Sequence, residues 1–147
     1  MNPLSILALT AGAAIATQAS MNARLGALLH NSMLGTTIAF AFSFLCSLVI
    51  VIFISRNYPT AAQIQSVPVY LWFSGGTLAA LGVGLFYYLI PKMGVGPMMS
   101  YALASQLLVA IMASHFGWFE LPVKTFTPSR ALGIAALIVG ILLINKD

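Results

Sequence analysis

The sequence predicts an all-α integral membrane protein with five transmembrane helices. Its 147 residues are 61% hydrophobic and only 5% charged, whereas a soluble globular chain carries roughly a quarter charged residues. Five apolar segments come close to the ~20 residues that an α-helix needs to cross about 30 Å of hydrocarbon. We therefore expect lipid to cover most of the outside of a single transmembrane domain over residues 1–147.

The five predicted spans follow one another with short connections. We expect helices at residues 3–21, 33–54, 69–90, 97–115 and 128–145. The first segment is apolar and then rich in small residues, as in a signal peptide. Because it lacks a basic start and four more apolar segments follow, we expect a retained helix.

Several ends of these spans carry local signals. Thr127 and Pro128 place a capping hydroxyl before a proline at the first helical position of the last span. The segment 91–94 (PKMG) predicts a tight break between the third and fourth spans. These signals favour helices joined by short turns.

The third span has aromatic residues at both ends, Tyr70 and Trp72 at one and Tyr87 and Tyr88 at the other. This spacing is typical of the two interfacial aromatic belts. Small residues that let helix backbones approach in lipid form stripes on the third and last spans: Gly76, Ala80 and Gly84, and Gly133, Ala136 and Gly140.

The few charged residues exclude several functions. Six basic residues are scattered along the chain, so there is no basic run of the kind that binds nucleic acid. The two acidic residues, Glu120 and Asp147, lie outside the predicted spans. The two histidines and the single Cys46 are far apart in sequence, and Cys46 lies in an apolar run that favours a small buried residue. We therefore predict no metal site, no cofactor and no enzyme activity.

The basic residues do not assign an orientation. With five spans, three basic residues fall on each side of the membrane: Arg56, Lys124 and Arg130 on one, and Arg24, Lys92 and Lys146 on the other. The positive-inside rule is therefore balanced. Either another feature sets the orientation, or the chain inserts both ways and pairs with an inverted copy. Such an antiparallel homodimer would have the ten-helix inverted-repeat architecture that supports alternating access around a midplane site.

Polar side chains inside predicted spans are the candidate site residues, because they are costly in lipid unless paired or hydrated. Gln18 and Asn22 are four residues apart and share a face of the first span. Gln106 lies near the middle of the fourth span, and Tyr101 little more than one turn before it. We expect Gln18, Asn22 and Gln106 to line a substrate site.

Three further residues complete the predicted site. Tyr101 or Trp72 would supply an aromatic wall, and Arg24 lies just beyond Asn22. Each candidate has a simpler interpretation. Gln106 can hydrogen-bond a neighbouring helix, Gln18 and Asn22 can cap loop backbone, Trp72 can be a belt residue, and Arg24 can be an interfacial anchor. Without a buried carboxylate, a neutral or zwitterionic substrate is easier to explain than a cation.

Several segments resemble a known family: QASMNARLG at 18–26, ASQLL at 104–108, SHFG at 114–117, PSRALG at 128–133 and LIVGIL at 137–142. In this order they are similar to the YdcZ family, the five-helix branch of the drug/metabolite transporter superfamily. The resemblance covers nearly the whole chain and implies dual-topology chains that pair in opposite orientations. Related small multidrug exporters keep a glutamate in the first helix, where this chain offers Gln18 instead.

Together these features predict a small-molecule transporter in a bacterial inner membrane. It would work by alternating access as an antiparallel homodimer, with the lipid bilayer and a small-molecule substrate as its other partners. Two alternatives remain open. One is a dual-topology ion channel, although small fluoride channels of that kind use four helices and a phenylalanine–asparagine arrangement that this sequence does not show. The other is a non-transporting membrane subunit that modulates another complex.

Overall fold

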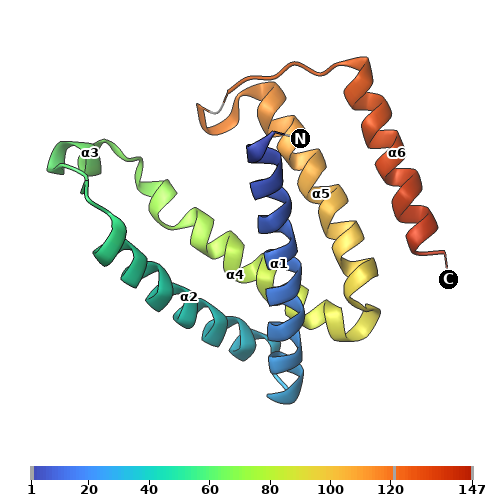
Figure 1. Cartoon of the computed structure of the whole chain (residues 1–147), viewed down its shortest axis with the longest axis horizontal. Helices are drawn as coiled ribbons and strands as arrows, with labels where there is room; N and C mark the ends of the chain where they lie inside the picture. The colour runs from blue at the N-terminus through green and yellow to red at the C-terminus, as the bar shows by residue number, and fades with distance from the viewer. Residues whose placement is uncertain (1, 121, 147) are drawn as a thin grey trace. The chain divides into compact units, whose positions relative to one another are not determined.

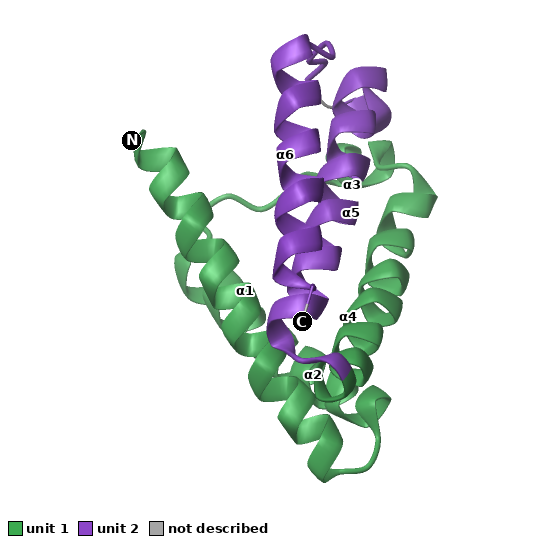
Figure 2. Ribbon diagram, turned by 90° about the vertical axis from the view of Figure 1, so that its right-hand side faces the viewer, with its two compact units in different colours: residues 1–92 green, residues 93–147 purple. Residues whose placement is uncertain are grey.

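The computed structural model describes residues 2–120 and 122–146, and the regular elements in this part of the chain are all helical. The chain divides into two compact units, residues 1–92 and 93–147 (Figure 2). The elements, in chain order, are α1 (Pro3–Leu28), α2 (Ser32–Ile54), the short α3 (Ala61–Ser66), the 3₁₀ turn η1 (Val69–Trp72), α4 (Ser74–Met93), α5 (Val95–Phe116), the 3₁₀ turn η2 (Trp118–Glu120) and α6 (Pro128–Ile144) (Figure 1).

The predicted all-helical fold is confirmed, and four helical segments are long and apolar enough to cross a membrane. They are Pro3–Leu28, Ser32–Ile54, Val69–Met93 and Val95–Phe116. The apolar α6 has 17 residues, so at 1.5 Å per residue it is only about 26 Å long. Within the described residues, the structure thus provides four helices of full spanning length, where the sequence predicts five.

Side-chain caps begin three of these helices. Asn2 Oδ1 accepts a hydrogen bond from the backbone N–H of Leu4 at 3.1 Å, and Asn31 Oδ1 accepts one from Leu34 at 3.0 Å. These bonds satisfy amide groups that have no partner inside the helix. The predicted cap of α6 is confirmed, since Thr127 Oγ1 accepts from the N–H of Arg130.

The break after the third span lies later than the sequence predicts. Instead of ending before Pro91, α4 continues through it to Met93. The chain turns at Gly94, which has a φ of 88°, and α5 starts at Val95. A membrane helix tolerates a proline when neighbouring groups satisfy the freed backbone. The turn itself needs a positive φ, which glycine adopts without steric cost.

In the first unit, α1 and α2 form a hairpin whose helices are in contact next to the turn at residues 29–31. The buried residues of α1 are Ala19, Ala23 and Gly26, and those of α2 are Gly35 and Thr36. A Cβ atom on Gly35 would lie only 2.9 Å from the Cα of Gly26. The two backbones are therefore in contact, as small residues permit at helix interfaces in lipid.

The second half of α4 packs on this hairpin through one glycine of the predicted stripe. A Cβ on Gly84 would meet Met33 Sδ at 2.6 Å and Thr36 Oγ1 at 3.6 Å. Gly76 has no atom within 4 Å of such a Cβ, and neither has Gly133 on α6. Of these three glycines, Gly84 packs against another helix of the chain, whereas Gly76 and Gly133 face open space.

The second unit is the α5–α6 pair with its connection. The side-chain amide of Asn145, just after α6, donates to Ser100 Oγ on α5 at 2.9 Å. At the other end, the backbone N–H of Lys124 donates to the carbonyl of Ser114 at 2.9 Å. These two bonds fix the segments just before and just after α6 to opposite ends of α5.

Large apolar side chains cover the outside of both units. Phe42 and Phe53 of α2 are 70% and 81% exposed, and Leu132 of α6 is 72% exposed. By contrast, the largest fully buried side chains among the described residues are those of Tyr87 and Thr36. A surface of this kind is stable in hydrocarbon and costly in water.

Candidate binding site

The candidate site starts from two amide side chains on α1. Gln18 and Asn22 are one turn apart, so their side chains meet on the same face. Asn22 Nδ2 donates a hydrogen bond to Gln18 Oε1 at 2.8 Å. The predicted pairing of these two residues on one face is therefore present in the structure.

Tyr87 of α4 closes this pair into a triangle. Its hydroxyl group accepts from Asn22 Nδ2 and donates to Gln18 Oε1, both at 3.0 Å. The Tyr87 side chain is only 1% exposed. Three uncharged side chains from two membrane-spanning helices are thus hydrogen-bonded to one another, which lowers the cost of placing them in a low-dielectric medium.

The triangle leaves specific groups free. Within the part of the chain that the structure describes, Gln18 Nε2 and Asn22 Oδ1 have no hydrogen-bond partner. An amide nitrogen offers two donors, and a carbonyl oxygen accepts two bonds. The site can therefore donate to one polar group of a ligand and accept from another without adding any charge.

These polar groups border a groove of about 460 Å³ between α1, α2 and α4. Its remaining wall comes from one stretch of α2: Ile38, Ala39, Phe40, Phe42, Ser43 and Cys46. The volume falls in the range of about 300–1,000 Å³ that is typical of small-molecule sites. An apolar wall with a few fixed polar groups also matches the usual chemistry of such sites.

The packing described above positions this groove. The contact between Gly26 and Gly35 holds α1 against α2, and Gly84 lets α4 reach Met33 and Thr36. Gly84 lies three residues before Tyr87, so both face the hairpin from the same side of α4. Close helix packing at the glycines therefore sets the distance at which Tyr87 meets the amides of α1.

Comparison with known proteins identifies the family. The sequence profile of the family described as "Putative inner membrane exporter, YdcZ" matches residues 3–143. The chain belongs to the YdcZ family. No curated protein and no solved structure matches the chain. The matched region includes every residue of the groove, and the family description is that of a membrane exporter rather than an enzyme.

Arg24 and Trp72 lie away from the groove in this YdcZ chain. The Arg24 side chain is exposed and does not line it. Trp72 lies in η1, where it lines a different pocket with Tyr58 and Gln63 from the connection between α2 and α4. The structure thus separates both residues from the pair formed by Gln18 and Asn22.

The other two predicted site residues, Tyr101 and Gln106, belong to α5 in the second unit. Both side chains are exposed. They lie five residues apart, so they point to different sides of the helix. The site proposed below is therefore built from the first unit alone.

For two residues of the groove, the structure differs from the sequence prediction. The sequence predicts Tyr87 in an aromatic belt, but this side chain is buried in the hydrogen-bonded triangle. Its position on the same face as Gly84 is a signal that could have placed it in a packed interface. Cys46 was expected to be buried and is exposed along the groove. An apolar run does not show which of its residues line a cavity, because the whole helix is apolar.

Proposed function

We propose that this chain is a subunit of an inner-membrane transporter for small uncharged or zwitterionic molecules, and that Gln18, Asn22 and Tyr87 bind the substrate. The observation that carries this proposal is the closed triangle of neutral polar groups beside a groove in membrane-spanning helices. Polar side chains in membrane-spanning helices are expensive and mark substrate pathways. The family description, an inner membrane exporter, supports the same class of function.

The absence of charge around the groove favours an uncharged substrate. The chain has only two acidic residues, Glu120 and Asp147, and the described residues that line the groove carry no charge. An isolated cation transferred from water to this groove would lose its hydration without gaining a counter-charge. A molecule with one hydrogen-bond acceptor, one donor and an apolar part would be compensated by Gln18 Nε2, Asn22 Oδ1 and the wall of α2.

We further propose that the two units act as one transmembrane domain with five spans, and that two copies pair in opposite orientations. The balanced basic residues support an arrangement in which both orientations occur. The 17 residues of α6 can serve as a fifth span with slight thinning of the bilayer around them. An inverted pair would place two equivalent grooves around one axis, the symmetry that alternating access uses.

Cys46 provides the test of the binding site, because it is the single cysteine of the chain and lines the groove. Purified protein in liposomes would be treated with N-ethylmaleimide in the presence of neutral amides, zwitterionic amino acids or tetraethylammonium. We expect a neutral or zwitterionic compound to slow modification of Cys46, and Asn22→Ala to abolish that protection. The matched control is Cys46→Ser combined with Ser66→Cys on α3, which should show no protection.

Two results would contradict the proposal. Protection by tetraethylammonium alone would mean that the groove selects cations. Protection that persists in Asn22→Ala would mean that the triangle does not contact the ligand. For a compound that protects, uptake into the same liposomes should saturate with concentration, whereas a channel would give an unsaturable flux.

A further inference from the structure

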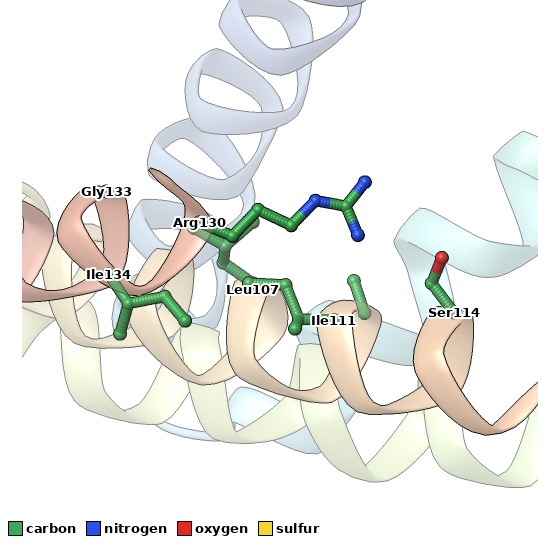
Figure 3. A pocket seen from close by; sticks show the side chains of 7 residues that line it. Leu107, Ile111, Ser114, Arg130, Gly133 and Ile134 are labelled. Carbon is green, nitrogen blue, oxygen red and sulfur yellow. The ribbon is translucent and has the colours of Figure 1, made fainter. Parts of the chain in front are cut away.

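A second groove lies in the α5–α6 unit and has a different chemistry. Its volume is about 410 Å³, and it is lined by Leu107, Ala110, Ile111, Ser114, Arg130, Gly133 and Ile134. None of these residues is buried. Figure 3 shows the Arg130 side chain extending from α6 along α5 toward Ser114, while Leu107 and Ile134 lie at the other end. The groove therefore has one polar end and one apolar end.

The charge at the polar end is not neutralised within the described part of the chain. Arg130 donates from one guanidinium nitrogen to the carbonyl oxygens of Lys124 and Thr125, at 3.1 and 3.0 Å. These carbonyls fix the direction of the side chain, but they carry no net charge. A guanidinium group has five N–H donors, so several remain for a ligand. The described residues place no carboxylate in an ion pair with it.

Further basic residues and the ends of the helices indicate that the polar end of the groove lies at the membrane interface. The backbone N–H of Lys124 is bound to the carbonyl of Ser114, so a second cationic residue belongs to the same end of α5. His115 is the next residue, and its ring contacts Phe116 at 5.0 Å between centroids. Aromatic and basic residues are typical of the depth at which lipid head groups lie.

We propose that this groove binds one anionic phospholipid, with its phosphate on Arg130 and an acyl chain between α5 and α6. The argument is complementarity of charge and shape. The unneutralised guanidinium fits a phosphate, and the apolar end, formed by Leu107 and Ile134, fits hydrocarbon. Basic pockets between membrane helices are a known way to select anionic head groups. This site is separate from the substrate groove and does not depend on the function proposed above.

The test measures lipid retained by detergent-purified protein in native mass spectrometry. The two probes are phosphatidylglycerol and phosphatidylcholine with the same acyl chains. We expect wild type to retain about fivefold more phosphatidylglycerol, the preference that one basic residue near the surface can give. Arg130→Gln should lose this preference, and Arg130→Lys should keep part of it. Arg56→Gln, which removes an exposed charge after α2, is the matched control and should behave as wild type.

A second variant tests the groove without changing a charge. A Cβ at Gly133 has no atom within 4 Å, so Gly133→Leu fills the groove without a backbone clash. We expect it to reduce the retention of both lipids. This variant also keeps the proposal testable if Arg130→Gln does not fold, because Arg130 holds the α5–α6 connection.

Three results would overturn the proposal. The first is an equal preference for phosphatidylglycerol in Arg130→Gln and Arg56→Gln. The second is displacement of the bound lipid by glycerol 1-phosphate at the same concentration, which would indicate a site for soluble phosphates. The third is that Gly133→Leu changes a dimer to a monomer and leaves lipid retention unchanged, which would make the groove an interface between copies.

Discussion

The hydroxyl oxygen of Tyr87 lies 3.0 Å from the side-chain carbonyl oxygen of Gln18, and this bond joins two helices across 69 positions of sequence. Asn22 bonds to both residues. The polar triangle is therefore both a helix contact and the candidate binding site. A change in its hydrogen bonds should affect packing and ligand binding together.

Tyr87→Phe removes both hydrogen bonds of the hydroxyl group and keeps the ring in its packed position. Interhelical hydrogen bonds in membrane proteins contribute about 0.6 kcal/mol on average, so we expect a loss of about 1 kcal/mol in unfolding free energy. The measurement is unfolding in mixed micelles with increasing dodecyl sulfate. Tyr88→Phe is the control, because its hydroxyl group contacts Lys92 rather than the triangle. Equal losses in the two variants would argue against a structural role for the triangle.

Gly35→Ala should destabilise the α1–α2 hairpin. The added Cβ would lie 2.9 Å from the Cα of Gly26, and because both atoms belong to backbone, the helices must separate. Overpacking of this kind costs about 1–3 kcal/mol. The apparent melting temperature in detergent would measure the effect. Gly12→Ala on α1 has no atom within 4 Å and should cause no loss; if it lowers stability as much, close packing is not the reason.

Gly84→Ala and Met33→Ala should show energetic coupling. The new Cβ on Gly84 would meet the flexible end of Met33, with its sulfur 2.6 Å away. The single Gly84 change should therefore cost stability, and shortening Met33 should relieve much of that cost. Neighbouring residues typically couple by about 0.5–3 kcal/mol in a double-mutant cycle. Strictly additive effects would mean that α4 does not pack on α2 at this point.

Removal of single basic residues should change the orientation of the chain. If orientation depends on the balance of lysine and arginine, Lys92→Gln should favour a C-terminus outside, and Arg56→Gln should favour one inside. The measurement uses Cys46→Ser with one cysteine added after the last residue, labelled with an impermeant maleimide before and after cells are permeabilised. The chain that keeps all six basic residues should be labelled in part before permeabilisation and in part only after it. A C-terminus that stays on one side in all three chains would contradict dual orientation.

The sequence predicts the helices more reliably than their contacts. Apolar length locates most ends of the helical segments within a few residues, and Thr127 marks the start of α6 correctly. The end predicted at residue 21 is wrong, because α1 continues through the polar residues Asn22 and Arg24 to Leu28. The short helix Ala61–Ser66 was missed because its capping box of Thr60 and Gln63 lies in a polar connection with no apolar run.

The site is predictable only in part, for a physical reason. Gln18 and Asn22 meet through helix periodicity, which the sequence contains directly. Tyr87 reaches them only after Gly84 has brought α4 against the hairpin, and such a contact depends on three helices at once. Nothing in the composition of α2 distinguishes Cys46 and its neighbours on the groove from equally apolar residues that face lipid.

The short turn between α1 and α2 has a consequence for biosynthesis. Only residues 29–31 separate the two helices, and α2 is the most apolar of the four spans. We therefore expect the less apolar α1 to enter the bilayer together with α2, as one hairpin, when the chain leaves the ribosome. A nascent chain that ends at Leu28 should insert less completely than one that ends at Tyr58, and the choice of orientation is made for both helices in the same step.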